Sequence, residues 1–490
     1  MRETTTLPYA LYSSLVAGVE AEAAAGKHRA GDAIKSLRFF ERAINTYEEG
    51  LRKFPSSFDL AYNKARVQYE VAAHPKLARQ LQQPLVPNPL LIVALTSHEY
   101  ALKLDEDDAD LLFNTAQVLT SISEELANGG STEEAINLLQ SAQNLRAQCL
   151  SVQEQKYTET KEQEREAREM FAAPPNHDDA AQEMQDEHSD ANSAKPSEEG
   201  PWASVLEPVT AETLLDTIIA CFGTMTTLCT TISTSRYPGW QDLMTKIESQ
   251  HTQLMGKAQG LSLPLTDTEK LNEISLTDAI LRSAMLDASF TFSDVVPAAT
   301  YKSMLDDLWD VTRSQLNLEA SVDALIAHAN ASVTFNSSLS TKQDDPNAGP
   351  QAEFRWAALT SAIKSLTTAS RISSISQEDK AKTHLLRGDV SLLQYRLSTG
   401  PVIHRQAAAN AKTLLKNAEV FYQNTAHLSG EQEDKDRALF RCTVVRNIVN
   451  GARGPALNAV FASDQETRAA EELQEMIDEG LLLEGTNSLG

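Results

Sequence analysis

Small residues recur at fixed intervals early in the chain, and this spacing constrains the fold more than any other feature. In the stretch AINTYEEGLRKFPSSFDLAYNKARVQY, which begins at Ala43, the order is Ala43, Tyr47, Gly50, Pro55 and Ala65. A small side chain lets two helices approach closely where they cross, and proline ends a helix because it has no N–H to donate. The aromatic ring fills the gap beside the crossing. The stretch therefore predicts two helices joined by a turn at Pro55.

The same spacing returns further along the chain. The first alanines of the first three copies are Ala43, Ala94 and Ala135, so the intervals are 51 and 41 residues. The second copy also contains Ala101 and Ala116, and the third contains Ala142. Weaker copies further on contain the small residues Ala362, Ala369, Gly388, Ala411 and Ala418. Helical hairpins do not bury their faces alone, so repeated hairpins stack on one another. The alternative is an irregular α bundle with chance alanine spacing.

This order of residues resembles the tetratricopeptide repeat, a helix-turn-helix unit of 34 residues. The resemblance implies an all-α fold of stacked antiparallel helical hairpins that form a right-handed superhelix. The sequence departs from the family in three ways: the intervals are longer, the family's Trp is absent, and Glu106 stands where a proline is expected. A helix break is therefore expected near Glu106.

Composition divides the chain into three parts. Residues 1–155 carry the clearest repeats, and residues 206–490 form a second helical region with degenerate hairpins. Between them, residues 156–205 are expected to continue a helix at first and then to be disordered, as an acidic linker. Residues 153–200 contain fourteen acidic and five basic side chains. Capping boxes, in which a hydroxyl precedes an acidic residue by three positions, begin at Thr266, Ser376 and Ser463.

The most membrane-like segment runs from Thr213 to Ser233 and contains Asp216 and many threonines. Its apolar side chains recur at spacings of three and four, which predicts a buried bundle helix rather than a membrane span. They are Leu214, Ile218, Phe222, Met225, Cys229 and Ile232. The apolar run near the N-terminus is broken by Ser13 and Ser14, so we expect no secretion signal.

The four cysteines show no CxxC spacing, which indicates core thiols in a reducing compartment. We therefore expect the protein in the cytoplasm, the nucleus or both. The sequence identifies neither compartment and leaves the oligomeric state open.

The chain has 68 acidic and 43 Lys or Arg residues, a formal charge of −25. The negative electrostatic field of such a chain repels nucleic acid and anionic membranes and attracts basic proteins. We therefore expect a protein partner, no nucleic acid and no membrane. The hypothesis is a non-catalytic scaffold or dedicated chaperone for a basic client such as a ribosomal protein or histone. The alternative is a structural subunit of a larger complex.

One motif resembles a catalytic site. In DDLWD, Asp306 and Asp310 lie four residues apart, so on a helix they share a face and are placed to hold Mg²⁺, as in all-helical prenyl synthases and terpene cyclases. Those enzymes need a second carboxylate cluster, and the sequence has no second DDxxD. An Mg-dependent enzyme is thus the remote alternative. We expect no catalysis, no cofactor and no bound metal.

Binding residues follow from the tetratricopeptide resemblance, in which the first helix of each unit lines a groove. The positions that match are Asp59, Tyr62, Asn63, Arg66, Tyr69, Asp110, Phe113, Asn114 and Gln117. Tyr62 and Phe113 would anchor a partner segment by apolar contact. Asn63 and Asn114 would bond its backbone. The alternative is that Tyr62 and Phe113 pack against neighbouring helices.

Overall fold

A computed structural model describes most of the chain, in segments that are helical almost throughout. The described residues are 9–28, 32–74, 77, 87–172, 208–235, 237–261, 268–293, 296–318, 320–340, 348–399, 402–451 and 465–483. They contain sixteen α-helices and no strand. The all-α fold class is therefore confirmed.

The chain forms two compact units. Unit 1 comprises 1–231 and 246–266, and unit 2 comprises 232–245 and 267–490. Unit 1 contains α1 (Tyr9–His28), α2 (Ala33–Lys53), α3 (Phe58–Ala73), α5 (Pro89–Leu102), α6 (Ala109–Asn128) and α7 (Thr132–Ala172). Two helices, α8 (Ala211–Ser235) and α9 (Trp240–Gly260), contribute residues to both units.

Unit 2 contains eight further helices. They are α10 (Thr268–Phe292), α11 (Ala298–Leu316), α12 (Val322–Ser340), α13 (Ala348–Ala369), α14 (Gln377–Arg396), α15 (Arg405–Leu428), α16 (Gln432–Val449) and α17 (Gln465–Asp478). The division into 1–155, 156–205 and 206–490 stays a prediction, because residues 173–207 lie outside the described ranges.

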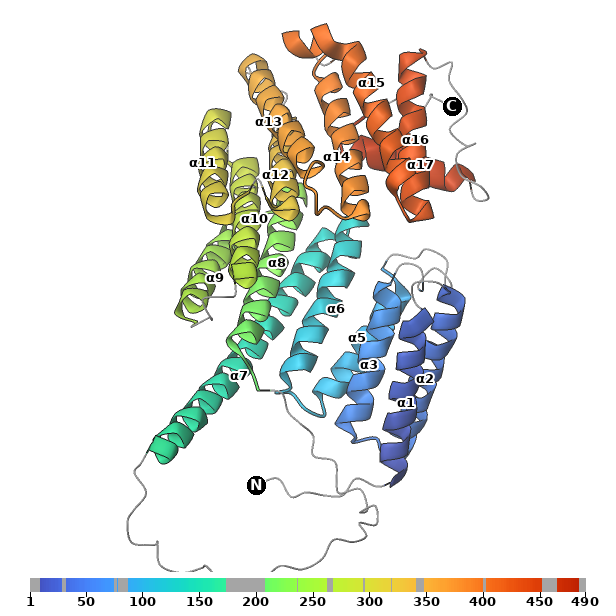
Figure 1. The fold of residues 1–490 in the computed structure, drawn as a ribbon, viewed down its shortest axis with the longest axis vertical. Helices are drawn as coiled ribbons and strands as arrows, with labels where there is room; N and C mark the ends of the chain where they lie inside the picture. The colour runs from blue at the N-terminus through green and yellow to red at the C-terminus, as the bar shows by residue number, and fades with distance from the viewer. Residues whose placement is uncertain are drawn as a thin grey trace, which may run out of the picture. The chain divides into compact units, whose positions relative to one another are not determined.

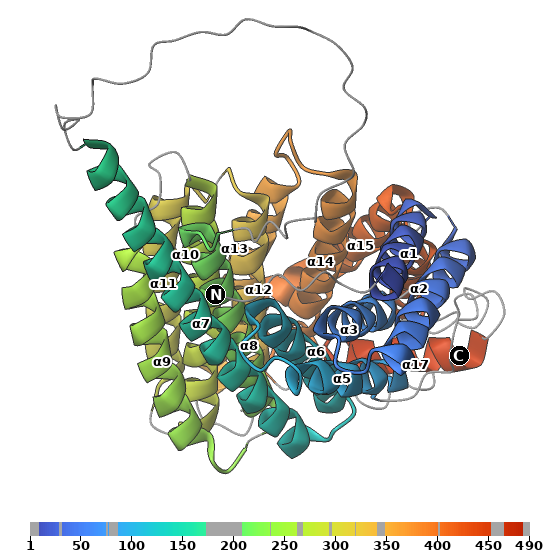
Figure 2. The same ribbon diagram turned by 90° about the horizontal axis from the view of Figure 1, so that it is seen from below.

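Consecutive helices pack as hairpins within each unit. In unit 1 the pairs are α1 with α2, α3 with α5, and α6 with α7, and each hairpin packs on the next one along the chain (Figure 1). Figure 2 shows α1, α2 and α3 side by side. In unit 2 the strongest pairs are α12 with α13 and α14 with α15. We call the earlier member of each pair the first helix and the later member the second helix.

The regularly spaced small residues lie where the helices touch. Ala43, Ala65, Ala94 and Ala116 are all 0% exposed. Ala116 shares an apolar cluster with Ala142 of the second helix of its hairpin. The prediction that narrow side chains mark the helix crossings is confirmed, since these alanines allow the backbones to approach closely.

Helix ends follow the local sequence. α2 ends at Lys53, two residues before Pro55, and α5 ends at Leu102, so the chain breaks near Glu106 as expected. Ser376 caps α14 by accepting a hydrogen bond from the N–H of Asp379 at 3.0 Å, which confirms that capping box. Asp32, Ser57 and Asp108 cap α2, α3 and α6 in the same way. The boxes expected at Thr266 and Ser463 lie outside the described residues.

The apolar stripe of α8 is buried, as its spacing predicts. Leu214, Ile218, Phe222, Met225, Cys229 and Ile232 are each at most 2% exposed. Within the described residues, α8 is the one helix long and apolar enough to cross a membrane, and 61% of the relevant window is buried inside the protein. This burial is typical of a core helix. The preceding helix, α7, runs to Ala172, and its side chains from Lys161 to Glu169 are exposed.

Candidate partner-binding face

The nine residues expected to line a groove all reach the surface of two neighbouring first helices. Asp59 and Asp110 are exposed, and the other seven are half-buried: Tyr62, Asn63, Arg66, Tyr69, Phe113, Asn114 and Gln117. The first five lie on α3 and the rest on α6, and these two helices are in contact. We call the surface formed by these nine residues the α3–α6 face.

Hydrogen bonds join the two helices across this face. Asn114 Nδ2 donates to the hydroxyl of Tyr62 at 3.0 Å, and the hydroxyls of Tyr69 and Ser121 lie 3.0 Å apart. Asn63 Nδ2 donates to the carbonyl oxygen of Asp59 at 2.9 Å, within its own helix. Part of the expected hydrogen-bonding capacity is therefore used inside the protein, and it holds α3 and α6 in register.

The two aromatic residues also pack internally, as the alternative expectation held. Tyr62 stacks on Phe58 with ring centroids 5.8 Å apart, and Phe113 lies under the guanidinium of Arg146, whose Cζ is 5.0 Å from the ring centroid. Both rings are nevertheless only half-buried. Each side chain is therefore still partly accessible to a partner.

An acidic cluster surrounds the start of α6. Asp105, Glu106, Asp107, Asp108 and Asp110 follow one another within six positions. Burial, together with Asp110 and Asp108, raises the pKa of Tyr62 to about 12. Burial also raises the pKa of the Asp108 carboxyl, with Asp110 and Asp105 adding to the effect. Five acidic side chains so close together repel one another, so the cluster favours an approaching cation.

Arg66 does not stand free on the face. Its guanidinium pairs with Glu22 of α1, and the same carboxylate accepts the hydroxyl of Tyr47 from α2. The ring of Tyr47 lies directly against Gly18, so a Cβ at that glycine would overlap it. Three helices of consecutive hairpins are thereby joined through one carboxylate.

The same arrangement recurs in unit 2. Tyr422 of α15 lies against Gly388 of α14 and donates to Asp389 at 2.8 Å, and Arg441 of α16 pairs with that carboxylate at 2.8 Å. The tyrosine precedes the arginine by nineteen residues in both units, Tyr47 to Arg66 and Tyr422 to Arg441. This is a structural repeat, since the same kinds of contact recur in separate hairpins with the same spacing from tyrosine to arginine.

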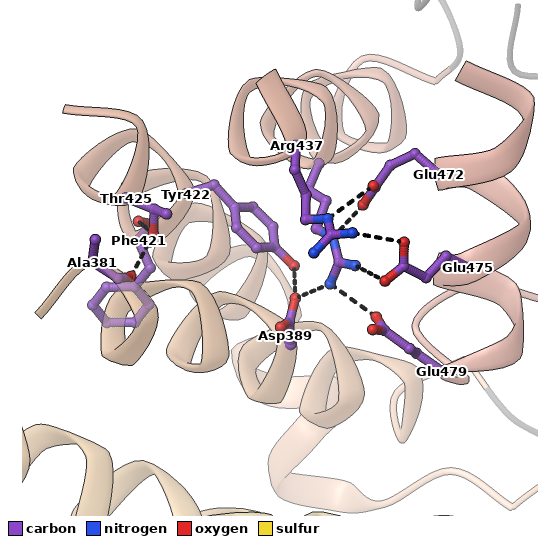
Figure 3. A network of polar contacts seen from close by, with 10 residues as sticks. Ala381, Asp389, Phe421, Tyr422, Thr425, Arg437, Glu472, Glu475 and Glu479 are labelled. Carbon is purple, nitrogen blue, oxygen red and sulfur yellow. Dashed lines mark hydrogen bonds and ion pairs between the residues drawn. The ribbon is translucent and has the colours of Figure 1, made fainter. Parts of the chain in front are cut away.

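In unit 2 the arginine is buried and strongly compensated. The side chain of Arg441 is 2% exposed and pairs with Glu472 and Glu479 of the C-terminal segment at 2.8 Å each, in addition to Asp389. Figure 3 shows Asp389, Glu472, Glu475 and Glu479 directed toward one centre. Arg437 adds a second bond to Glu472 at 3.1 Å. These pairs hold α17 against α14 and α16.

A buried arginine beneath the α3–α6 face has no such compensation. Arg146 of α7 is 2% exposed, and its Nη2 donates to Gln117 Oε1 at 3.0 Å. Its Nε and Nη1 have no hydrogen-bond partner among the described residues. The tetratricopeptide pattern did not predict a role for this residue, although its spacing gives a signal. Arg146 stands four positions after Ala142, where Ala43 and Ala418 are followed by the buried Tyr47 and Tyr422.

Three open cavities of unit 1 lie away from the nine residues. The largest, of about 610 Å³, is lined by residues of α5, α6 and α7 and of the loop between α5 and α6, among them Leu102, Leu112 and Leu145. Another, of about 380 Å³, lies between α2, α3 and α5 beside Lys64 and Tyr100. The third lies between α7, α8 and α9. None of the nine predicted binding residues lines any of these three cavities.

Comparison with known proteins yields limited likeness. No protein-family model matches the sequence. The chain is 31% identical over 90 residues to UPF0656 protein C926.02 of Schizosaccharomyces pombe, and the alignment covers 18% of this chain. It spans 19% of the length of that relative. Among solved structures it is similar to a circular tandem repeat protein with novel repeat topology, at 13% identity over 96% of each chain, with a TM-score of 0.32. No function is transferred at that level.

Proposed function

We propose that this protein is a non-catalytic scaffold or dedicated chaperone of the tetratricopeptide type, which binds a basic protein segment along the α3–α6 face. Two features support the tetratricopeptide assignment: the stacked hairpins, and the buried alanines where their helices cross. Ribosomal proteins and histones are the client classes that match the charge. The cytoplasm or the nucleus is the proposed location.

The observation that carries this proposal is the acidic cluster at the start of α6, next to Tyr62. Asp107 and Asp110 are exposed, and Asp108 has a raised pKa because of burial and its acidic neighbours. Lys or Arg side chains of a client would offset the repulsion between these neighbouring carboxylates. The half-buried Tyr62 offers apolar contact beside them. The formal charge of −25 would speed the encounter with such a client.

A fixed subunit of a larger complex remains the second candidate. The size of the native protein in cell extract, measured by gel filtration, separates the two. A chaperone elutes mainly as the free protein or with one client, and a subunit elutes only in the complex.

Catalysis at Asp306 is the least supported candidate. Lys302 already bonds both carboxylate oxygens of Asp306 at 2.5 Å, and Asp310 lies 4.0 Å from Arg313. Within the described residues, no group of three His, Cys, Asp or Glu side chains is arranged to hold a metal ion. If an Asp306→Ala, Asp310→Ala variant responded to Mg²⁺ differently from the wild type, the result would support the enzyme hypothesis.

The test begins with affinity capture and identification of bound proteins. The affinity of the identified client is then measured between about 50 and 500 mM salt. We expect it to fall steeply, because the screening length between exposed charges falls from about 14 Å to about 4 Å over this range. An Asp59→Asn, Asp110→Asn variant should bind more weakly and with a smaller salt dependence.

The matched control is Glu162→Gln, Glu166→Gln, which removes the same charge from the exposed part of α7. Weaker binding in this control to the same degree would assign the effect to net charge alone. An affinity independent of salt would refute the basic client.

A further inference from the structure

Arg146 is a buried cation that the described part of the protein does not neutralise. No described carboxylate pairs with it, and the groups that influence it electrostatically are Cys221, Cys149 and Tyr69. Its hydrogen-bond partner, Gln117, is a neutral amide. Gln143, one turn earlier on α7, has an unpaired Oε1, but an amide oxygen does not compensate a full charge.

Arg441 shows how this chain otherwise treats a guanidinium of equal burial. Arg146 and Arg441 are 2% and 1% exposed as whole residues. Arg441 is surrounded by Asp389, Glu472 and Glu479. A buried charge without a partner is costly, and replacing it with an apolar residue of similar size is usually neutral or stabilising. The absence of compensation at Arg146 therefore points to a missing external anion.

The position of Arg146 indicates from which side that anion would come. Among the side chains that contact the guanidinium are Phe113, whose ring lies against it, and Gln117, which accepts a hydrogen bond from its Nη2. Both lie on α6, both are half-buried, and both belong to the α3–α6 face. If Gln117 rotated away from the guanidinium, Nη2 would be free to bind a ligand. Displacement of the Phe113 ring would give a ligand access to Nε and Nη1.

We propose that Arg146 is the receptor for a carboxylate that a bound protein segment inserts between Phe113 and Gln117. The planar guanidinium offers two parallel N–H groups, which match the two oxygens of a carboxylate. A client segment for this face is then mainly basic, to suit the aspartates at the start of α6, but carries one acidic group two helical turns further along. Asp110 precedes Gln117 by seven residues, or about 10 Å along the helix axis.

This inference extends the proposed function, yet its test needs no client, so the two can fail separately. The probes are small carboxylates at about 200 mM, compared with chloride at equal ionic strength. N-acetylglycine presents a chain-terminal carboxylate, and N-acetyl-glutamate α-methylamide presents a side-chain carboxylate. Thermal unfolding of the full chain is the readout.

We expect at least one probe to raise the Tm of the wild type by about 2 °C relative to chloride, since a ligand of the native state stabilises it. The stronger of the two probes identifies the source of the carboxylate. Arg146→Met should lose the carboxylate-specific shift while its Tm in chloride stays equal or rises. The control Arg165→Met, on the exposed part of α7, should keep the shift.

A second variant keeps the inference testable if Arg146→Met folds poorly. Gln117→Ala removes the internal hydrogen-bond partner and part of the cover, so the carboxylate-specific shift should increase. A wild type that unfolds at the same temperature in all three salts overturns the proposal. An undiminished shift in Arg146→Met, or a reduced one in Gln117→Ala, overturns it as well.

Discussion

The hydroxyl of Tyr422 donates to Asp389 at 2.8 Å, and its ring lies against Gly388, the residue just before that aspartate. The equivalent pair in unit 1 is Tyr47 and Glu22, with Gly18 under the ring. In both cases an arginine of the helix that follows the tyrosine's helix completes the contact. A glycine, a tyrosine, a carboxylate and an arginine thus join one hairpin to the next, and their separate roles can be tested.

The glycines are required by the close approach of the tyrosine rings. Gly18→Ala should lower the free energy of unfolding by about 1–3 kcal/mol, because the new methyl group overlaps Tyr47. Gly388→Ala should lower the free energy of unfolding similarly, because its methyl group overlaps the ring of Tyr422. Gly223→Ala in α8 is the control: nothing lies within 4 Å of its added Cβ, and it should be stabilising by about 0.5–1 kcal/mol. Urea unfolding measures all three, and a destabilised control would refute the steric explanation.

Arg441 is expected to be essential for the stability of unit 2. Arg441→Met leaves Asp389, Glu472 and Glu479 without their shared cation and should cost about 3–5 kcal/mol. Arg446→Met is the comparison, since that side chain is 41% exposed and, among the described residues, forms an ion pair with Glu419 only. It should cost no more than about 1 kcal/mol. Equal losses in the two variants, measured by chemical unfolding, would show that burial of the ion pairs is unimportant.

His328 should make the stability of unit 2 depend on pH. Burial, with Arg313 and Lys302 acting in the same direction against Asp306 and Asp310, lowers the pKa of His328 to about 4. An imidazole whose pKa is lower in the folded state contributes stability above about pH 6.5, and that stability is lost as the pH falls toward about 4. The loss from this residue is about 3 kcal/mol.

His328→Gln should therefore flatten the pH dependence of unfolding between about pH 6.5 and 4, measured as the difference from wild type at each pH. The difference removes contributions from carboxyls with raised pKa values, such as Asp287, Glu472 and Glu479, which act in the opposite direction. His427→Gln, which removes an exposed imidazole, serves as the control. Parallel curves for wild type and His328→Gln would contradict the prediction.

The cysteines should be unreactive in the folded protein. All four are buried, and burial raises the pKa of Cys149 to about 12 and that of Cys221 to about 11. Because the thiolate is the reactive form, a chromogenic disulfide reagent at about pH 8 should label none of them until the chain unfolds, and then all four. Ser141→Cys, at an exposed position, should add one rapidly labelled thiol. Rapid labelling of the wild type would show that the core opens readily.

The sequence by itself was sufficient for the local structure. The alanine spacing predicted the helix crossings, Pro55 the end of α2, Ser376 the start of α14, and the apolar stripe the burial of α8. These features depend on residues within one or two turns of a helix, where periodicity and capping act directly. The expected surface location of Tyr62 and Gln117 came from the resemblance to the tetratricopeptide repeat.

The tertiary structure alone decided which residues meet across hairpins. Arg441 and Asp389 are 52 residues apart, and Arg146 and Gln117 are 29 apart. Nothing in the local pattern distinguishes Arg441, which pairs with four carboxylates, from Arg146, which pairs with none among the described residues. That difference depends on which helix packs beside each guanidinium, because the charge that a buried group meets is set by its neighbours in space.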